Sequence, residues 1–280
     1  MAADPQDQQS GARLRLALFL SVGMAMTGLA LIGYGIHLFV PDSAWDVFGD
    51  TELRSIDVRF SVRGEHPRPK DIVVVKIDDR TFYELDQRWP FARSLYARVT
   101  RNLKKDGAKV IAYDIQVSEQ TPGDEGALQD NLFLRANRAA GNAVFSTTEV
   151  GKKGQPNFLG EQPGIRFARV RVGNGNFDSD RGGVDRRLPY EIDGLKSFSV
   201  VAVERATGKT VGPFSSDTNL IDFVGPVGTM PSISFSRVYL EKFQQGFFRG
   251  KIAVIGAWAP SLQDIHPVSF GQDEMPGPEI

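Results

Sequence analysis

The sequence predicts an α/β fold: a single domain with a mostly parallel central sheet flanked by helices, preceded by one transmembrane helix. Residues 16–40 contain no Asp, Glu, Lys or Arg, which indicates the membrane segment. Two short apolar runs, at residues 71–78 and 108–115, are bounded by turn-forming residues, as is typical of buried strands. A segment with apolar residues at helical spacing lies between them, so the two strands are expected to be parallel.

The chain begins with a predicted cytoplasmic tail, residues 1–15, followed by the predicted membrane span, residues 16–40. As a helix the span has a length of roughly 37 Å, more than the roughly 30 Å hydrocarbon core of a bilayer. A signal peptide or a buried soluble helix is the alternative, but no small-residue cleavage site follows the segment. Arg13 and Arg15 precede the span whereas acidic residues follow it, which predicts a cytoplasmic N-terminus and an extracytoplasmic body.

The extracytoplasmic body is expected to cover residues 41–280 and to begin with a helix. Five apolar side chains fall on one broad face of that helix: Trp45, Phe48, Leu53, Ile56 and Phe60. Because the helix follows a membrane span directly, it either carries motion between span and body or simply packs on the body as its first element.

For the rest of the body, the sequence predicts an alternation of helices and strands. Pro90 suits the first turn of the helix between the first two strands, and Gly107 ends that helix. Residues 151–195 are rich in Gly, Pro, Asn and Asp, which predicts hairpins and loops. The remaining elements are a helix at 124–139, a strand at 142–150, a helix at 196–208, a strand at 219–225, a helix at 232–243 and a strand at 251–257.

Composition and motifs exclude several classes of function. The formal net charge of -1 gives no basic footprint for nucleic acid, and the absence of cysteine excludes disulfide scaffolds and thiolate chemistry. A calcium loop starting at Asp178 fails because its twelfth position is Pro189 instead of a carboxylate. The histidines lie in the predicted span or before prolines in predicted turns, in no zinc-binding pattern. We therefore predict no metal site, no cofactor and no catalytic residue.

Acidic residues follow the predicted strands. Asp78 and Asp79 come after the first strand and Asp114 ends the second, and ligands of open α/β sheets bind at this edge. We expect the two strands to be adjacent, so that these carboxylates meet and bind a cation, an amine or a hydroxylated ligand. The alternative is structural, since such residues also cap turns and helix N-termini or pair with an arginine. The candidate ligand-binding residues are Asp78, Asp79, Arg93, Asp114, Glu119 and Asp264.

Six motifs, in this order, resemble the CHASE2 domain family over roughly residues 45–280. They are IVVVKIDD, WPFAR, GAKVIAYDI, LIDFVGPVGTMPSISFSRV, GKIAVIGAWAPSLQD and MPGPEI. Two departures are visible. Phe91 and Ala92 stand where the family usually has Trp-Pro, and Pro278 stands where it usually has valine.

The resemblance implies an extracytoplasmic sensory domain of a bacterial inner-membrane receptor, anchored by an N-terminal membrane helix. Further membrane helices and a cytoplasmic output domain usually follow, so the chain is expected to be a fragment that lacks its output. That output resembles an adenylate or guanylate cyclase, a histidine kinase, a diguanylate cyclase or a protein kinase in different members. The chain itself is then no enzyme, and its partners are the membrane, an unknown small-molecule or protein stimulus and a second copy of itself. An exported enzyme that uses the acidic edge and a membrane-tethered assembly module are the competing interpretations.

Overall fold

The computed structural model describes residues 24, 27–28, 42–180, 182–215, 219–270 and 274–280. The predicted span at 16–40 therefore lies outside the described residues, apart from Met24, Thr27 and Gly28. Within the described part of the chain, no helix is both long and apolar enough to cross a membrane. The chain divides into two compact units, Met1–Ile56 and Asp57–Ile280.

A six-stranded parallel sheet forms the centre of the second unit, which confirms the predicted α/β fold. Its strand order is β6-β3-β2-β10-β1-β9, and every neighbouring pair is parallel. Strands buried on both faces read as continuous apolar runs, which is why the sequence pattern identified four of the six. The strands are β1 (Ile72–Ile77), β2 (Val110–Asp114), β3 (Ala143–Thr147), β6 (Arg171–Asn174), β9 (Ser232–Ser234) and β10 (Ile252–Ala257).

Strand β10 lies between β1 and β2, so the prediction that β1 and β2 are adjacent is wrong. In the register, Val254 of β10 is opposite both Val74 of β1 and Ala112 of β2. The connection from β1 to β2 skips one position in the sheet, and the last long strand of the chain fills it. The carboxyl ends of β1 and β2 are therefore two strand spacings apart, roughly 10 Å.

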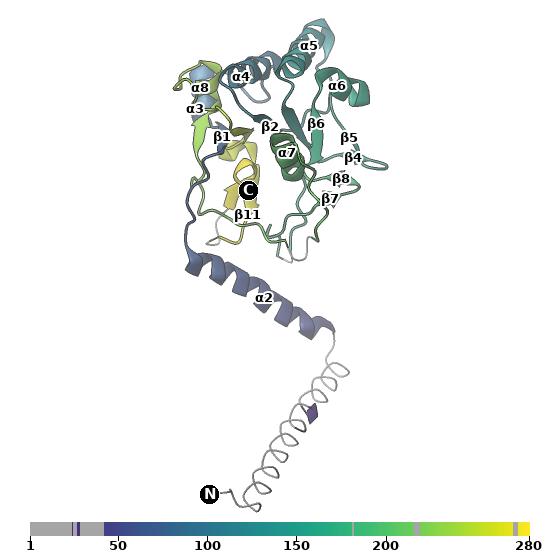
Figure 1. The fold of residues 1–280 in the computed structure, drawn as a ribbon, viewed down its shortest axis with the longest axis vertical. Coiled ribbons are helices and arrows are strands. Elements are labelled where there is room, and N and C mark those ends of the chain that lie inside the picture. The colour runs from purple at the N-terminus through teal and green to yellow at the C-terminus, as the bar shows by residue number, and fades with distance from the viewer. Residues whose placement is uncertain (1–23, 25–26, 29–41, 181, 216–218, 271–273) are drawn as a thin grey trace, which may run out of the picture. The chain divides into compact units, whose positions relative to one another are not determined.

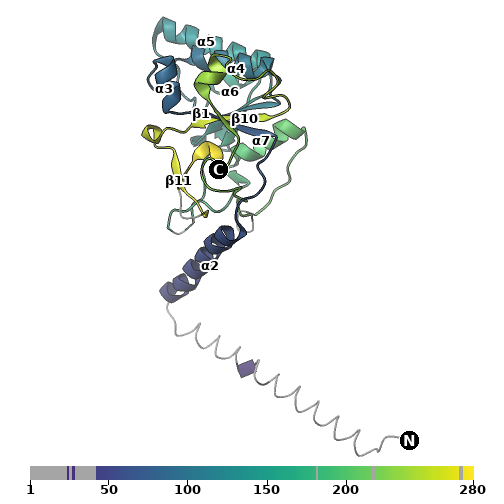
Figure 2. The same ribbon diagram turned by 90° about the vertical axis from the view of Figure 1, so that its left-hand side faces the viewer.

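Helices cover the two faces of the sheet unequally (Figures 1 and 2). The first face is covered by α3 (Asp79–Leu85), α4 (Arg93–Lys105), α5 (Gly123–Ala140), α6 (Glu161–Ala168) and α8 (Phe235–Tyr239). The second face carries α7 (Phe198–Thr207) and the short 3-10 helix η3 (Gly277–Glu279). Most of the core lies under the first face, where the rings of Tyr113 and Phe145 stack with centroids 4.7 Å apart. The sparser cover of the second face leaves room for a cavity.

The first predicted helix is present as α2 (Asp42–Arg63), which begins in the first unit and ends in the second. In its last turns Phe60 is buried and packs edge-on against Phe223. The three small hairpins pair β4 (Val150–Gly151) with β5 (Gln155–Pro156), β7 (Glu191–Ile192) with β8 (Leu195–Lys196), and β11 (Ile265–Pro267) with β12 (Glu274–Pro276).

Several local predictions are wrong. Residues 219–225 form no strand, because Leu220 and Ile221 place their side chains against a cavity on the second face instead of extending the sheet. Residues 232–243 are divided between β9 and α8, and residues 151–195 contain α6 and β6 besides hairpins. Pro90 precedes α4 by three residues, and the acidic turn after β1 begins the additional helix α3.

Candidate functional site

A polar cavity of about 460 Å³ lies at the carboxyl edge of the sheet. Residues at or just after the ends of β2, β3, β6 and β10 line it, together with residues from β11 and the loop before β7. Its volume falls within the range of small-molecule sites, about 300–1,000 Å³. The polar side chains that matter most are Asp114, Ser146, Ser179, Asp185, Asp264 and His266.

Asp114, the last residue of β2, is the most perturbed acid of this cavity. The pKa of Asp114 is raised to about 7, first by burial and then by the negative charge of Asp264, against a hydrogen bond from Ser146 and the charge of His266. The register of the sheet places Asp114 opposite Gly256 of β10, and Asp264 lies in the loop that follows β10. Asp114 is therefore divided between its neutral and charged forms near neutral pH.

His266 on β11 lies between two carboxylates. Its Nδ1 is 2.9 Å from Asp185 Oδ2 and its Nε2 is 3.2 Å from Asp264 Oδ1. These contacts, with Asp185 first and Asp264 second, raise the pKa of His266 to about 10. The imidazole is therefore charged at neutral pH and donates both N–H groups to its partners.

Segment 179–187 connects this cavity with helix α2. On the cavity side, Ser179 Oγ donates to Asp185 Oδ1 at 2.5 Å, and Asp185 in turn contacts the imidazole. The next residue, Arg186, is 5% exposed and makes two hydrogen bonds, of 2.9 and 2.8 Å, with the carboxylate of Asp57 on α2. Two consecutive residues of one short segment thus make different contacts: Asp185 contacts the imidazole of His266 in the cavity, and Arg186 contacts Asp57 on helix α2.

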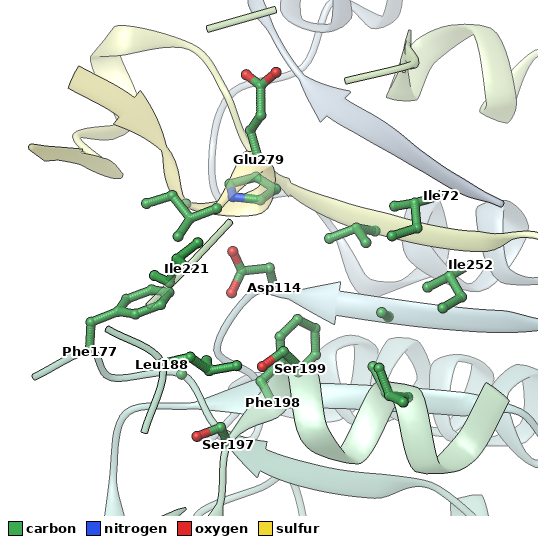
Figure 3. A pocket seen from close by; sticks show the side chains of 18 of the residues that line it. Ile72, Asp114, Phe177, Leu188, Ser197, Phe198, Ser199, Ile221, Ile252 and Glu279 are labelled. Carbon is green, nitrogen blue, oxygen red and sulfur yellow. The ribbon is translucent and has the colours of Figure 1, made fainter. Parts of the chain in front are cut away.

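A second, apolar cavity of about 390 Å³ lies on the sparsely covered face of the sheet. Side chains of β1, β2, β10 and α7 line it, and the carboxylate of Asp114 points into it (Figure 3). Asp114, Phe177 and Gly277 belong to the linings of both cavities, so the two hollows adjoin.

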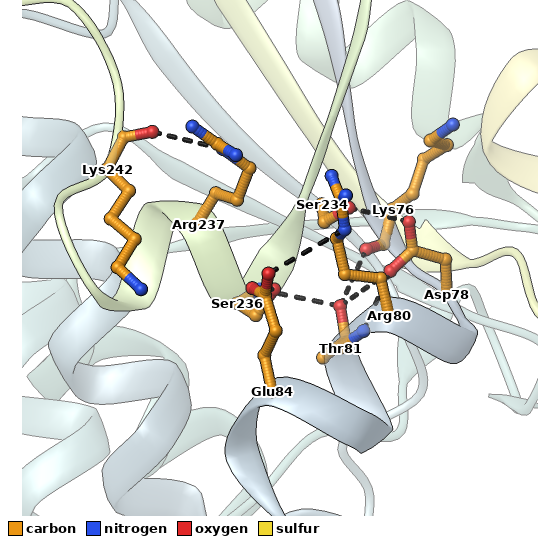
Figure 4. Close-up of polar contacts among 9 residues, drawn as sticks. All are labelled: Lys76, Asp78, Arg80, Thr81, Glu84, Ser234, Ser236, Arg237 and Lys242. Atoms are coloured by element: carbon orange, nitrogen blue, oxygen red, sulfur yellow. Dashed lines mark hydrogen bonds and ion pairs between the residues drawn. The ribbon is translucent and has the colours of Figure 1, made fainter.

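Asp78 and Asp79 lie apart from Asp114, on the far side of β10. Asp78 caps helix α3, because it accepts hydrogen bonds from the backbone N and the Oγ1 of Thr81, at 3.0 and 2.8 Å, and from Ser234 Oγ at 2.7 Å (Figure 4). Both carboxylate oxygens are thus engaged, as the structural alternative expects. Asp79 is exposed and lines a separate, more open hollow beside Arg80.

Arg93 and Glu119 also do not reach the polar cavity, against expectation. Arg93 begins α4, and its Nε lies 3.8 Å from Asp130 Oδ1 of α5, so it pairs with a helix that the sequence did not connect to it. Glu119 is exposed and lines none of the three hollows described here. Of the six candidates, the structure brings Asp114 and Asp264 to the polar cavity, whereas Asp78 and Asp79 line the separate hollow beside Arg80.

Three polar residues of the cavity were not among the candidates predicted from the sequence: Ser179, Asp185 and His266. Asp185 and His266 are separated by 81 positions in the sequence, so no local pattern connects them. The acidic loop that starts at Asp178 was a usable indication, because its failure as a calcium site left Asp185 without an assigned role. Trp89 also lines the polar cavity and is 39% exposed.

The site residues offer no metal centre. Among the described residues, no three His, Cys, Asp or Glu side chains are arranged to hold a metal ion. In the polar cavity the imidazole of His266 lies between the carboxylates of Asp185 and Asp264, so these two groups do not face a common metal position.

Comparison with known protein families shows to which family the chain belongs. The family model of the CHASE2 domain matches residues 26–280. The chain belongs to the CHASE2 family. CHASE2 domains are extracytoplasmic sensory domains and not catalytic ones, so a role in sensing outside the cytoplasm agrees with the fold and with the cavity described above. No curated protein and no solved structure shows significant similarity to this CHASE2 chain.

Proposed function

We propose that this CHASE2 chain is the receptor region of a bacterial inner-membrane signalling protein and binds a small ligand in the polar cavity. The observation that carries the proposal is the convergence of Asp114, Asp185, Asp264 and His266 from separate chain segments on one cavity of about 460 Å³. Perturbed titratable groups gathered in a cavity of this size are typical of binding sites.

Binding is passed on through segment 179–187. A ligand that displaces His266 or Asp185 also displaces Arg186, whose two hydrogen bonds to Asp57 fix the last turns of α2. Helix α2 directly follows the span predicted at 16–40 in the sequence, so a ligand that favours one arrangement is expected to bias the membrane segment as well. A differential binding energy of about 1–3 kcal/mol gives a response of several-fold or more.

The output of the proposed receptor is a cyclase or kinase domain in the cytoplasm, and the receptor acts as a homodimer. Membership of a sensory-domain family supports a signalling role for the whole protein, and the output domain and the homodimer are part of this proposal.

An exported enzyme is the weaker alternative. A general base needs a free lone pair near neutral pH, whereas His266 is charged and has both nitrogens engaged by carboxylates. Ser179 donates to Asp185 instead of to the imidazole, so no nucleophile is activated by this histidine.

Thermal-shift screening of the full chain in mild detergent against small periplasmic metabolites tests the proposal. A ligand present at one hundred times its Kd stabilises the folded state by about 2.7 kcal/mol, which raises Tm by about 5 °C or more. The shift is expected to disappear in Asp114→Asn and to persist in Asp193→Asn, which changes an exposed turn. If no metabolite shifts Tm and crosslinking recovers a protein partner, the chain is an assembly module.

A further inference from the structure

The polar and apolar cavities form one bipartite site. They share five lining residues, Asp114, Gly175, Asn176, Phe177 and Gly277, and together they extend from the carboxyl edge onto the second face of the sheet. Asp114 belongs to both linings, and Figure 3 shows its carboxylate among the side chains of the apolar cavity. A single ligand that fills both hollows therefore has to place a group against this carboxylate.

The other two acids of the apolar cavity are engaged elsewhere. Glu279 accepts hydrogen bonds from the backbone N–H groups of Gly228 and Met230, at 2.8 to 2.9 Å. Asp222 is largely exposed and pairs with Arg63 at the end of α2. Most of the remaining wall is apolar, with side chains such as that of Ile252, although Asn and Ser side chains also contribute, so this cavity accepts a hydrocarbon or aromatic body.

The positive charge of His266 acts on Asp114 but does not offset the effects of burial and of the Asp264 charge. The described residues that line the two cavities include no lysine and no arginine. The charge of His266 is already balanced by Asp185 and Asp264, which contact its two nitrogens. An ionised Asp114 therefore carries a negative charge that no lysine or arginine of the described linings balances, and a bound cation would compensate it.

We propose that the ligand is an amphipathic organic cation, with an ammonium group against Asp114 and an apolar body in the apolar cavity. The inference rests on the proposed sensing function and specifies the chemical class of the ligand. An alcohol of the same shape leaves the carboxylate without a counter-charge, and an anion is repelled by both Asp114 and Asp264. An ammonium donates up to three hydrogen bonds and balances the charge.

The ionisation of Asp114 adds a pH dependence. The groups that act on it are Asp264 after β10, His266 on β11 and Ser146 on β3, and burial is the largest influence, so that the pKa lies near 7. An ammonium binds the ionised form. Its affinity is expected to rise by about tenfold or more between pH 5.5 and pH 8.5, because the carboxylate becomes fully charged over this interval.

Three probes with one apolar body test the inference: phenylbutylamine, phenylbutanol and phenylbutyrate. Isothermal titration of the full chain in detergent at pH 8 is expected to give about tenfold tighter binding of the amine than of the alcohol, and no binding of the carboxylate. Asp114→Asn is expected to bring the amine down to the affinity of the alcohol. Asp193→Asn, which alters an exposed turn, is expected to leave the amine unchanged.

A charge introduced on the rim gives a second, independent variant. Val203 on α7 lines the apolar cavity and is 44% exposed, so Val203→Lys is tolerated by the helix and places a cation beside the ligand. This variant is expected to weaken amine binding and to improve phenylbutyrate binding. The matched control is Leu128→Lys on α5, at a position that is 61% exposed and outside both cavities.

The outcomes separate the two proposals. If the alcohol or the carboxylate binds at least as tightly as the amine and Asp114→Asn changes neither, the cation is the wrong class while sensing in the cavity stands. If these probes and the broad metabolite screen all fail to bind, the cavity is no ligand site, and both proposals fall.

Discussion

Replacing Asp114 by asparagine tests the electrostatics of the polar cavity directly. Asparagine keeps the shape of the side chain, and its amide oxygen still accepts a hydrogen bond from Ser146, but it carries no charge. The folded-state pKa of Asp114 lies near 7, above its ordinary value of 3.8, so the folded state holds the proton more tightly than the unfolded state does. The stability of the parent chain therefore falls as pH rises from 4 to beyond 7, and the asparagine variant lacks this loss.

The magnitude follows from the two pKa values. Between 3.8 and about 7 the loss amounts to roughly 4 kcal/mol, at about 1.4 kcal/mol per pH unit. Asp114 borders two cavities, and solvent there screens part of the charge, so we expect a difference of about 2–4 kcal/mol at pH 8.5. Near pH 4 the parent and the variant are expected to be equally stable.

Urea unfolding of the full chain in detergent, followed by tryptophan fluorescence at pH 4, 5.5, 7 and 8.5, measures the difference. Asp114→Asn is expected to be the more stable protein at pH 8.5, with a gap that closes toward pH 4. Asp193→Asn serves as the control at an exposed turn and is expected to follow the parent at every pH. A gap that does not change with pH, or an asparagine variant less stable than the parent at pH 8.5, refutes the assignment of a buried, proton-holding Asp114.

Three further predictions concern the surroundings of the site. His266→Gln is expected to lower the free energy of unfolding by about 2 kcal/mol at pH 6, because the raised pKa of His266 stabilises the folded state there. The deficit should vanish as pH passes 10. A deficit in urea unfolding that stays constant with pH contradicts this prediction. Arg186→Met is expected to lower the free energy of unfolding by about 3 kcal/mol, since it removes the buried partner of Asp57. Unchanged protection of α2 in hydrogen exchange would count against the proposed coupling between the cavity and α2. Gly173→Ala is expected to cost about 1–3 kcal/mol, because its Cβ meets backbone 2.6 Å away, whereas Gly212→Ala, in open space, should have little effect on Tm.

Local sequence patterns were sufficient for most of the fold. The continuous apolar run of β1 and the helical spacing of the segment after Pro90 gave elements close to their observed bounds, because burial on both faces of a sheet or on one face of a helix leaves a local periodicity. The same patterns missed α6 and β6, which lie in a segment whose glycines and prolines predicted only loops. They also misassigned residues 219–225, whose apolar side chains cover a cavity instead of pairing in the sheet.

The candidate site was only partly accessible to the same reasoning. The sequence showed that carboxylates follow strands, and Asp114 and Asp264 do meet in one cavity, although their ligand remains a proposal. Asp78 was grouped with them because consecutive strands were expected to be neighbours. One of its carboxylate oxygens caps α3 through Thr81, and the other accepts from Ser234, a residue 156 positions away that no local pattern connects to it.

What the sequence determined by itself was therefore the kind of protein: an α/β sensory domain of the CHASE2 family, with acids at the carboxyl ends of its strands. Only the tertiary structure decided which acids meet, because that depends on the order of strands in the sheet. The insertion of β10 between β1 and β2 separated Asp78 from Asp114, and the bridge between Asp185 and Val268 brought Asp185 to His266. Strand order is set by contacts between distant segments, and such contacts leave no periodicity in the sequence from which they can be read.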